Sequence, residues 1–427
     1  MRRLLPEIVV LSILATAGAL VFVNDTDPSD RPPAAEQAAA PGNAPQLGPT
    51  PDPDDPHTWQ TSDQVPGEIA APLVPGQRAM LGRTLRFTYE PVPGVSVTAW
   101  DARTRRGPVR YFVTRVKWNA PGITIDYAKG KRVRRTQTVT DMLSRTPDAV
   151  AGINGDFFDI SDTGAPLGLG HERGGVLWNA IDFGWNNALS VNTNGRWHVG
   201  QVPMVAEVRR RPEIAITNYN SPRVKVGGTG IYDWRFGSSA GYGWTDGQRR
   251  QVRLVKIVDG RVVANRTDLP NGTRIDGTWL IARGDHAEDK LQGLRVGTRV
   301  GLRYHLDGDI AMAITGNTVL LKKRQVLAVD DSELHPRTAV GVDRDTKELI
   351  FLVVDGRQEF SRGYTMVELA VMLRRLGAED ALNLDGGGST TLAAVRDGKL
   401  KVLNSPSDGA QRAVPNGLEV IYRPPAS

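Results

Sequence analysis

The sequence predicts an α+β fold, with a β-sheet core, few flanking helices and a second β-rich part in the middle of the chain. Short runs rich in β-branched and aromatic residues, bounded by Gly, Pro, Asn and Asp, recur from residue 85 to the C-terminus, and two stretches have the pattern of a helix. The 427 residues include no cysteine, so disulfide bonds are excluded and the ordered part has to rely on its hydrophobic core.

Residues 1–23 have the pattern of a secretory signal peptide or an uncleaved membrane anchor. Arg2 and Arg3 precede an apolar run over 8–23. This run is slightly short for a membrane-spanning helix, so cleavage and anchoring both stay open. We expect an exported protein, secreted or held on the outer face of the cytoplasmic membrane, with membrane contact only through this segment.

Residues 24–78 are expected to be a disordered, proline-rich linker. Twelve prolines fall within 24–76, among Asp, Ala and Thr, with few aliphatic residues to bury. Residues 1–78 carry a net charge of −6 and residues 79–427 a net charge of +12. The predicted folded domain, 79–425, is therefore basic, which favours an anionic partner such as a phosphate-bearing glycan. Nucleic acid is disfavoured because the basic residues are dispersed and form no recognisable module.

The elements of this domain follow from local patterns. A helix is expected over 140–145 with Thr140 as its N-cap, and another from Thr365 to Leu376, where Thr365 and Glu368 form a capping box and Gly377 ends the helix. The middle part, about 205–310, is β-rich, and Asp259-Gly260 between two apolar runs predicts a hairpin. Strands are expected at 85–89, 95–100, 110–118, 122–127, 148–154, 252–258, 261–264, 278–282, 299–306, 337–342, 349–354, 381–384 and 418–422.

Three of the apolar strands end in polar residues of similar chemistry. The pairs are Asn154 with Asp156, Asp355 with Arg357, and Asn383 with Asp385. If the strands lie side by side, their ends form one cluster of carboxylates, amides and arginines outside a rigid sheet. The alternative is that each Asp-Gly is a separate solvated turn. Three such ends favour a site, and the glycines of 386–388 would let backbone amides approach a ligand closely.

The residue types in this cluster exclude several kinds of catalysis. There is no thiol, the six histidines form no metal-binding pair such as HExxH, and Ser389 lacks the signature of a serine nucleophile. Carboxylates with arginines remain, and these suit glycosyl transfer to water. When the leaving group is a phosphate monoester it is already stable as an anion. The enzyme then mainly has to hold the phosphate, as arginine does with two hydrogen bonds.

Residues 383–391 (NLDGGGSTT) resemble the signature of the phosphodiester glycosidase family. Other blocks agree in the same order over about 145–425: 153–158 (INGDFF), 337–341 (RTAVG), 354–357 (VDGR), 368–370 (ELA), and 406–409 (PSDG) with Arg412. The resemblance implies hydrolysis of a sugar linked through its anomeric carbon to a phosphodiester. It also implies a twisted, mixed β-sheet. The cysteine-rich modules of animal members have no counterpart here, and the sugar is not identified.

Each site residue receives a hypothetical role. Asp385 and Asp355 are the carboxylates nearest the reacting carbon, and Arg337 and Arg357 hold the phosphate. Other residues would bind sugar hydroxyls, order the carboxylates, offer hydrogen-bond donors or bind substrate in the last polar loop: Asp156, Asn154, Asn383, Gly386, Gly387, Ser389, Asp408 and Arg412. The sequence assigns no definite cofactor: clustered Asp and Asn oxygens suit Ca²⁺ or Mg²⁺, but no loop matches a known metal spacing.

Two other functions fit parts of the pattern. A non-enzymatic module that only binds phosphate-containing envelope polymers would explain the basic domain and its linker, but not carboxylates gathered where an anion binds. An ordinary glycosidase on neutral glycans would cleave aryl glycosides that lack phosphate.

Overall fold

The computed structural model describes residues 60–425, so the expected signal segment and most of the expected linker lie outside the described residues. The described part is mainly β-sheet with few helices, which confirms the β-rich architecture expected from the sequence. Nearly all strand pairs are antiparallel; β12 (Ile216–Tyr219) and β13 (Thr229–Asp233) are parallel.

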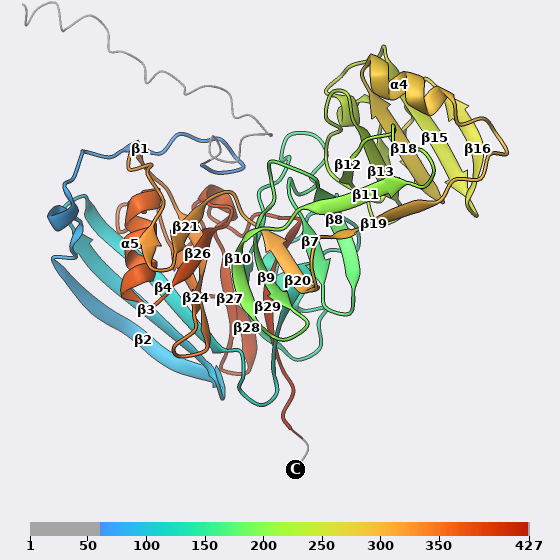
Figure 1. The fold of residues 1–427 in the computed structure, drawn as a ribbon. Coiled ribbons are helices and arrows are strands. Elements are labelled where there is room, and N and C mark those ends of the chain that lie inside the picture. The colour runs from blue at the N-terminus through green and yellow to red at the C-terminus, as the bar shows by residue number, and fades with distance from the viewer. Residues whose placement is uncertain (1–59, 426–427) are drawn as a thin grey trace, which may run out of the picture. The chain divides into compact units, whose positions relative to one another are not determined.

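An eight-stranded sheet supplies two of the three strand ends. Its order is β2 (Gly82–Val92), β3 (Val95–Thr104), β4 (Gly107–Lys117), β25 (Glu348–Val354), β24 (Arg337–Asp343), β26 (Asp380–Asn383), β21 (Val319–Lys322) and β22 (Gln325–Val326). Helix α5 (Met366–Arg375) packs on one face of this sheet through Leu369, Ala370 and Leu373 (Figure 1). Its capping box is the one expected: Thr365 Oγ1 accepts from Glu368 N, and Thr365 N donates to Glu368 Oε2.

A five-stranded sheet supplies the third strand end. Its order is β28 (Lys399–Val402), β27 (Leu392–Arg396), β6 (Ala149–Asn154), β29 (Asn416–Tyr422) and β5 (Ile123–Lys129). The largest buried apolar cluster joins Val340 and Phe351 of the eight-stranded sheet to Ile153 and Leu418 of this one. Burial of their apolar side chains against each other fixes the two sheets together and with them the ends of their strands.

The third large sheet has ten strands and includes most of the β-rich middle part. Its order is β10 (Trp197–Gln201), β9 (Asn187–Asn192), β20 (Ile310–Thr315), β7 (Gly170–Glu172), β8 (Val176–Ile181), β12, β13, β18 (Thr278–Arg283), β15 (Val252–Val258) and β16 (Arg261–Arg266). The hairpin at Asp259-Gly260 joins β15 to β16 as expected. Two-stranded pairs complete the fold: β1 (Glu68–Ile69) with β23 (Glu333–Leu334), β11 (Met204–Val208) with β19 (Leu302–Leu306), and β14 (Ser238–Ala240) with β17 (Asn271–Arg274).

Two helices differ from expectation. Helix α3 (Val139–Leu143) is capped by Thr138, whose side chain accepts from Asp141 N, and not by Thr140. Helix α4 (Asp285–Gln292) was not expected. It follows Gly284, which offers no side chain to cap the helix, so the sequence carries no N-cap signal there.

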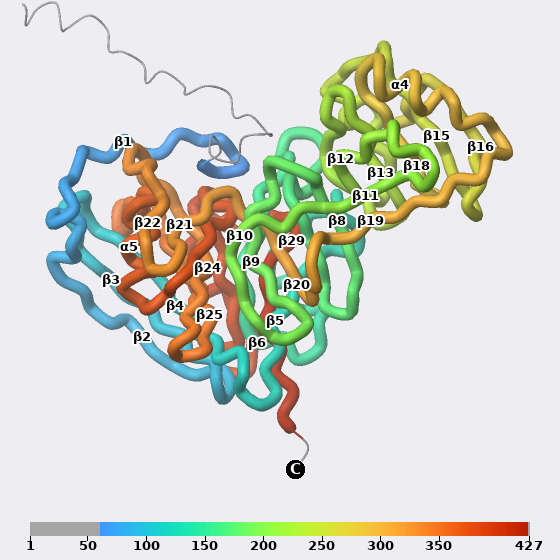
Figure 2. Tube along the Cα trace, viewed as in Figure 1, coloured from blue at the N-terminus to red at the C-terminus, as the bar shows by residue number. Residues whose placement is uncertain are grey.

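The folded region begins earlier than expected. Residues 60–78, assigned to the linker from their composition, include β1 and the 3₁₀ turn η2 (Pro75–Arg78). Figure 2 traces this segment past β1 into β2. Gly67 N donates to Glu333 Oε2 and Ala70 N donates to Ser332 O, so the segment is bonded to the folded domain. Within 60–425, no helix is both long and apolar enough to cross a membrane.

Candidate functional site

The three polar strand ends meet at one edge of the sheets. Strand β24 is antiparallel to both β25 and β26, and its first residue, Arg337, pairs with Val354 at the end of β25. Ala339 pairs with Asn383 at the end of β26. The polar residues that follow β25 and β26 therefore lie beside the start of β24, as the sequence predicted.

Asn154 joins the end of β6 to this edge. Its side-chain amide donates to Asp385 O at 2.7 Å, and its Oδ1 accepts from Thr338 Oγ1 at 2.7 Å and from Thr391 N at 3.0 Å. These three partners all belong to the chain, and the side chain is fully buried. Asn154 therefore bonds the backbone beside Asp385, and its expected role in binding sugar hydroxyls or ordering the carboxylates stays a prediction.

The Asp385 carboxyl is buried at the centre of the cluster. It is 0 % exposed, Oδ1 accepts from Ser62 N at 2.9 Å, and Oδ2 has no partner among residues 60–425. Burial raises the pKa of Asp385 to about 7. Near neutral pH this carboxyl is therefore populated in both its protonated and its ionised form, so it can act as an acid or as a base.

Asp156 is a second buried carboxyl that interacts with Asp385. Its Oδ2 accepts from Gly168 N at 2.8 Å, while Oδ1 has no partner within the described part of the chain. Burial raises the pKa of Asp156 well above its ordinary value, and the negative charge of Asp385 adds to this effect. Because two negative charges in one buried site repel each other, this pair of carboxyls is more stable with one proton between them than with both groups ionised.

Asp355 lies in a different local environment. Its Oδ1 accepts from Ser405 N at 2.9 Å and from the Asn404 side chain at 3.2 Å, and Asn404 also donates to Thr390 O. Burial raises the pKa of Asp355 to about 6. The largest charge effects on it come from Arg110, which lowers its pKa, and Asp101, which raises it. Asp355 is tied to the cluster through Asn404, and its expected pairing with Asp385 stays a prediction.

The turn after β26 presents a donor one residue later than expected. Gly387 N donates to Pro336 O, so it is already used. Gly388 N, in contrast, donates a hydrogen bond to the Asp63 carboxylate, at 3.1 Å. Gly386 O accepts from Ser389 N, and Asn383 donates to Asn317 Oδ1 at 2.7 Å.

Arg337 is placed differently from the expected phosphate clamp. Its guanidinium is fully buried and bonds the chain itself: Nε donates to Tyr364 O at 2.9 Å and Nη2 donates to Gln60 Oε1 at 2.8 Å. Burial lowers the pKa of Arg337 to about 10. These contacts correct the expectation. The Arg337 guanidinium bonds Gln60, at the start of the described chain, and Tyr364, and it does not face a ligand.

Arg357 and Arg412 converge on one carboxylate, that of Asp63. Arg357 donates to it from Nη1 at 2.9 Å and from Nη2 at 3.3 Å, and Arg412 Nη2 donates at 3.0 Å. Asp408 also pairs with Arg412: its Oδ2 accepts from Nε at 2.8 Å and lies 2.6 Å from Nη2, the nitrogen that also donates to Asp63. His335 Nδ1 lies 3.3 Å from Arg357 Nη2 and accepts from it, because burial lowers the pKa of His335 to about 4 and keeps the ring neutral.

Sequence reasoning missed several of these residues. Ser62 and Asp63 lie in a stretch whose composition indicated a linker, and no local signal points to a role. Asn416 accepts from Asp156 N at 2.8 Å and donates to Tyr127 Oη. Its only signal is the turn-prone sequence Pro-Asn-Gly, and the structure places Asn416 at the first residue of β29.

Within 60–425, no group of three or more His, Asp or Glu side chains is placed to hold a metal ion. The divalent cation considered from the sequence stays a prediction. Two cavities are lined in part by Arg357 and by Gln60, and none of Asp156, Asp355 and Asp385 lines either of them. One, of about 370 Å³, is lined by Arg357, Gln358 and Arg362, and the other, of about 450 Å³, is lined by Gln60, Asn187 and Met366.

Residues 248–421 match the phosphodiester glycosidase family. This match includes the ends of β25 and β26 and the loop with Arg412, while Asn154 and Asp156 lie outside it. A mouse (Mus musculus) relative, N-acetylglucosamine-1-phosphodiester alpha-N-acetylglucosaminidase, is 34% identical over 169 residues, which cover 36% of this chain and 30% of the relative. The chain therefore spans less than a third of that relative's length.

Two solved structures share the fold. A hypothetical protein from Synechocystis superposes with a TM-score of 0.64 at 19% identity, over 80% of this chain and 64% of its own. A candidate exported protein from Burkholderia pseudomallei superposes with a TM-score of 0.63 at 18% identity, over 83% of this chain and 99% of its own. The resemblance read from the strand ends is confirmed by the family match and the mouse relative: this chain is related to the phosphodiester glycosidase family.

Proposed function

We propose that this protein is a hydrolase that cleaves the bond between the anomeric carbon of a sugar and a phosphodiester. The observation that carries the proposal is the pairing of two buried carboxyls, Asp385 and Asp156, with a separate set of cationic donors, Arg357 and Arg412. Each carboxyl keeps one oxygen without a partner in the described chain and so has an atom to offer to a substrate; Asp355 Oδ2 shares this feature. Carboxyls supply acid and base, and guanidiniums supply an anion site.

The reaction needs little from a general acid. Water attacks the anomeric carbon, the bond from that carbon to the phosphate oxygen breaks, and its electron pair leaves with the phosphate monoester. Asp385 or Asp156, whichever is ionised, accepts the proton of the attacking water, or attacks the carbon first to give an intermediate that water then opens. The neutral carboxyl of the pair donates a hydrogen bond to a sugar hydroxyl or to the leaving oxygen.

The proposed substrate is an extracellular or envelope glycan that carries sugar-1-phosphodiester groups. The name of the mouse relative supports this bond, and N-acetylglucosamine is the first sugar to test. Export is supported by the charged and apolar pattern of residues 1–23 and by the exported-protein candidate from Burkholderia. We assign Asp355 a positioning role for the loop at Asn404 and Ser405, which bond its Oδ1, while its Oδ2 has no partner in the described chain.

The rival is a module that binds phosphate-bearing polymers and cleaves nothing. It would use the same arginines, but it gives no reason for buried carboxyls beside an anion site, since they weaken anion binding. Asp385 and Asp156 therefore favour the enzyme.

The test compares two substrates that share one sugar. For the full-length chain we expect kcat/KM for free-sugar release to be about 10²-fold or more higher on N-acetylglucosamine-1-phosphodiesters than on an aryl glycoside of the same sugar, because only the first engages the arginines. Equal rates on both would favour an ordinary glycosidase. Phosphate binding with no sugar released from a panel of sugar-1-phosphodiesters would favour the binding module.

A further inference from the structure

Asp156 is held by a closed ring of hydrogen bonds among five residues. Its backbone N donates to Asn416 Oδ1 at 2.8 Å, and the Asn416 side-chain amide donates to Tyr127 Oη at 3.0 Å. Tyr127 Oη donates to Asn179 Oδ1 at 3.3 Å, and the Asn179 side-chain amide donates to Gly168 O at 2.8 Å. Gly168 N then donates to Asp156 Oδ2 at 2.8 Å, which closes the ring.

The ring joins two of the large sheets. Tyr127 of β5 and Asn416 of β29 belong to the five-stranded sheet, and Asn179 of β8 belongs to the ten-stranded sheet. All three side chains are buried, so water does not compete for their hydrogen bonds. Each of the three both donates and accepts within the ring. Loss of any one group therefore leaves buried neighbours without a partner.

Two glycines make room for the ring. A Cβ at Gly155 would lie 2.4 Å from Asn416 Oδ1, and a Cβ at Gly170 would lie 2.2 Å from Tyr127 Oη. These distances are too short for atoms that are not bonded to each other, so at both positions only glycine admits the polar group. Gly155 directly precedes Asp156, and Gly170 begins β7. The backbone on both sides of the loop 156–169 therefore has the shape that the ring requires.

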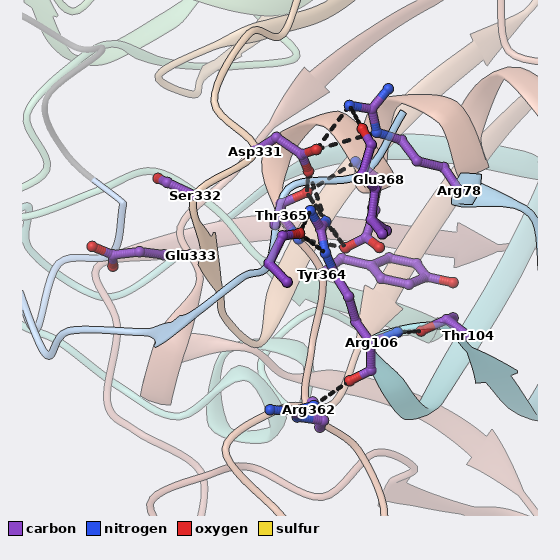
Figure 3. Close-up of polar contacts among 12 residues, drawn as sticks. Arg78, Thr104, Arg106, Asp331, Ser332, Glu333, Arg362, Tyr364, Thr365 and Glu368 are labelled. Carbon is purple, nitrogen blue, oxygen red and sulfur yellow. Dashed lines mark hydrogen bonds and ion pairs between the residues drawn. The ribbon is translucent and has the colours of Figure 1, made fainter. Parts of the chain in front are cut away.

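The ring differs from the buried polar network at the start of α5, which holds the fold together. Figure 3 shows that network, in which Arg106 Nη1 lies 2.7 Å from Asp331 Oδ1 and 3.1 Å from Glu368 Oε2. There a cation compensates the charge of both carboxylates. Among residues 60–425, in contrast, no lysine or arginine pairs with Asp156, and the bond to its Oδ2 comes from the neutral amide of Gly168. The ring thus fixes the Asp156 carboxyl and leaves it able to change charge.

We propose that Tyr127 is a positioning residue for Asp156 and that it acts through Asn416 and Asn179. In this arrangement Asp156 Oδ2 stays on the amide of Gly168. Its Oδ1, which has no partner within the described part of the chain, is the oxygen that meets the substrate. The inference rests on the proposed function for the role of Asp156.

The charged groups around the ring leave Tyr127 able to donate. Burial raises the pKa of Tyr127 well above its usual range, and the negative charges of Asp156 and Glu172 add to this effect. The hydroxyl is therefore protonated throughout the pH range of an activity assay. Asp385 is the charged group that acts on Asp156 itself, and it is unchanged when Tyr127 is substituted.

Tyr127→Phe removes one oxygen and keeps the aromatic ring, so the fold should survive. Without the hydroxyl, Asn416 and Asn179 each lose a partner, and the bond from Gly168 N to Asp156 weakens. Because this bond stabilises the ionised carboxyl, its weakening raises the pKa of Asp156 further. We expect kcat to fall about 10- to 10²-fold, KM to stay within about threefold, and the acid limb of the pH profile of kcat to move to higher pH.

The pKa of Asp156 can also be measured without turnover. In full-length protein labelled with ¹³C at aspartate carboxyl carbons, the signal that disappears in Asp156→Asn belongs to Asp156. Its titration by NMR gives the pKa directly. We expect the pKa in Tyr127→Phe to lie about half a unit to one unit above that in wild type, the equivalent of one hydrogen bond.

Tyr232→Phe is the matched control. Tyr232 of β13 is also fully buried, and its hydroxyl also accepts from an asparagine side chain, that of Asn218, at 3.2 Å. It packs in a different apolar cluster, against Phe236 and Trp244. We expect Tyr232→Phe to lower the melting temperature about as much as Tyr127→Phe does. It should keep the kcat, the pH profile and the Asp156 signal of wild type.

The results separate this inference from the proposed function. An unchanged pKa of Asp156 in Tyr127→Phe would overturn the inference, whatever the rate of sugar release. An equal rise in Tyr232→Phe would overturn it as well, and so would full kcat in Tyr127→Phe when wild type releases sugar. A higher pKa in Tyr127→Phe alone, with no sugar released by wild type, would support the ring and count against the enzymatic function.

Discussion

Asp385→Asn is expected to lower kcat by about 10³-fold or more, because it removes the carboxyl at the centre of the cluster whose pKa lies at about 7. The amide keeps an oxygen that can accept from Ser62 N, so the fold should survive. We therefore expect loss of turnover without loss of structure. Measured kcat on a sugar-1-phosphodiester, together with thermal unfolding, checks both halves of this prediction.

The pH dependence of unfolding provides a second readout on the same variant. Since folding raises the pKa of Asp385 to about 7, the native state keeps a proton that the unfolded chain releases above about pH 4. The carboxyl thus favours folding less as the pH rises from about 4 to about 7. Asp385→Asn should melt close to wild type at pH 5 and above it at pH 8.

The matched control for this variant is Asp343→Asn, at the opposite end of β24 from Arg337. Asp343 is also buried and accepts from Thr346 N at 3.1 Å, but it is far along the strand from the cluster. Its substitution should leave kcat within about twofold of wild type. If Asp385→Asn retained kcat within a few-fold of wild type, Asp385 would be removed from the mechanism.

Asp156→Asn is expected to reduce kcat as strongly as Asp385→Asn, by about 10³-fold, whereas Asp355→Asn should cost less than about tenfold. The reason is electrostatic: the charge of Asp385 acts on Asp156, while Asp355 feels Arg110 and Asp101. Steady-state kinetics of the two variants on one sugar-1-phosphodiester measures this difference.

The double variant of Asp156 and Asp385 sharpens this comparison. If the two carboxyls act as one unit, the double variant should be scarcely slower than either single variant, since the second change removes nothing more. The reverse ranking, with Asp355→Asn inactive and Asp156→Asn active, would restore the pair of carboxylates expected from the sequence.

Local sequence patterns predicted much of the fold. The capping box of Thr365 and Glu368, the hairpin at Asp259-Gly260 and the strands that end at Asn154 and Asn383 all depend on neighbours within a few residues. Such patterns also placed the polar strand ends at one site, because buried strands of one core have little freedom to separate.

The contacts of Ser62 and Asp63 at the site could not be predicted in this way. Asp63 meets Arg357 and Arg412 across about 290 to 350 residues of sequence. Nothing near Asp63 in the sequence specifies these partners, and its proline-rich surroundings indicated a linker. The same holds for Arg337, whose position at the start of a strand suggested a ligand-binding role. Its actual partners, Gln60 and Tyr364, come from distant parts of the chain.

The position of the broken bond tests the central claim most directly. Hydrolysis of a sugar-1-phosphodiester in H₂¹⁸O, followed by ³¹P NMR or mass spectrometry of the phosphate monoester, shows which atom water attacks. Attack at the anomeric carbon leaves the monoester unlabelled and places ¹⁸O in the released sugar, and this is the expected result. Monoester that carries ¹⁸O would mean attack at phosphorus, and the protein would then be a phosphodiesterase and not a glycosidase.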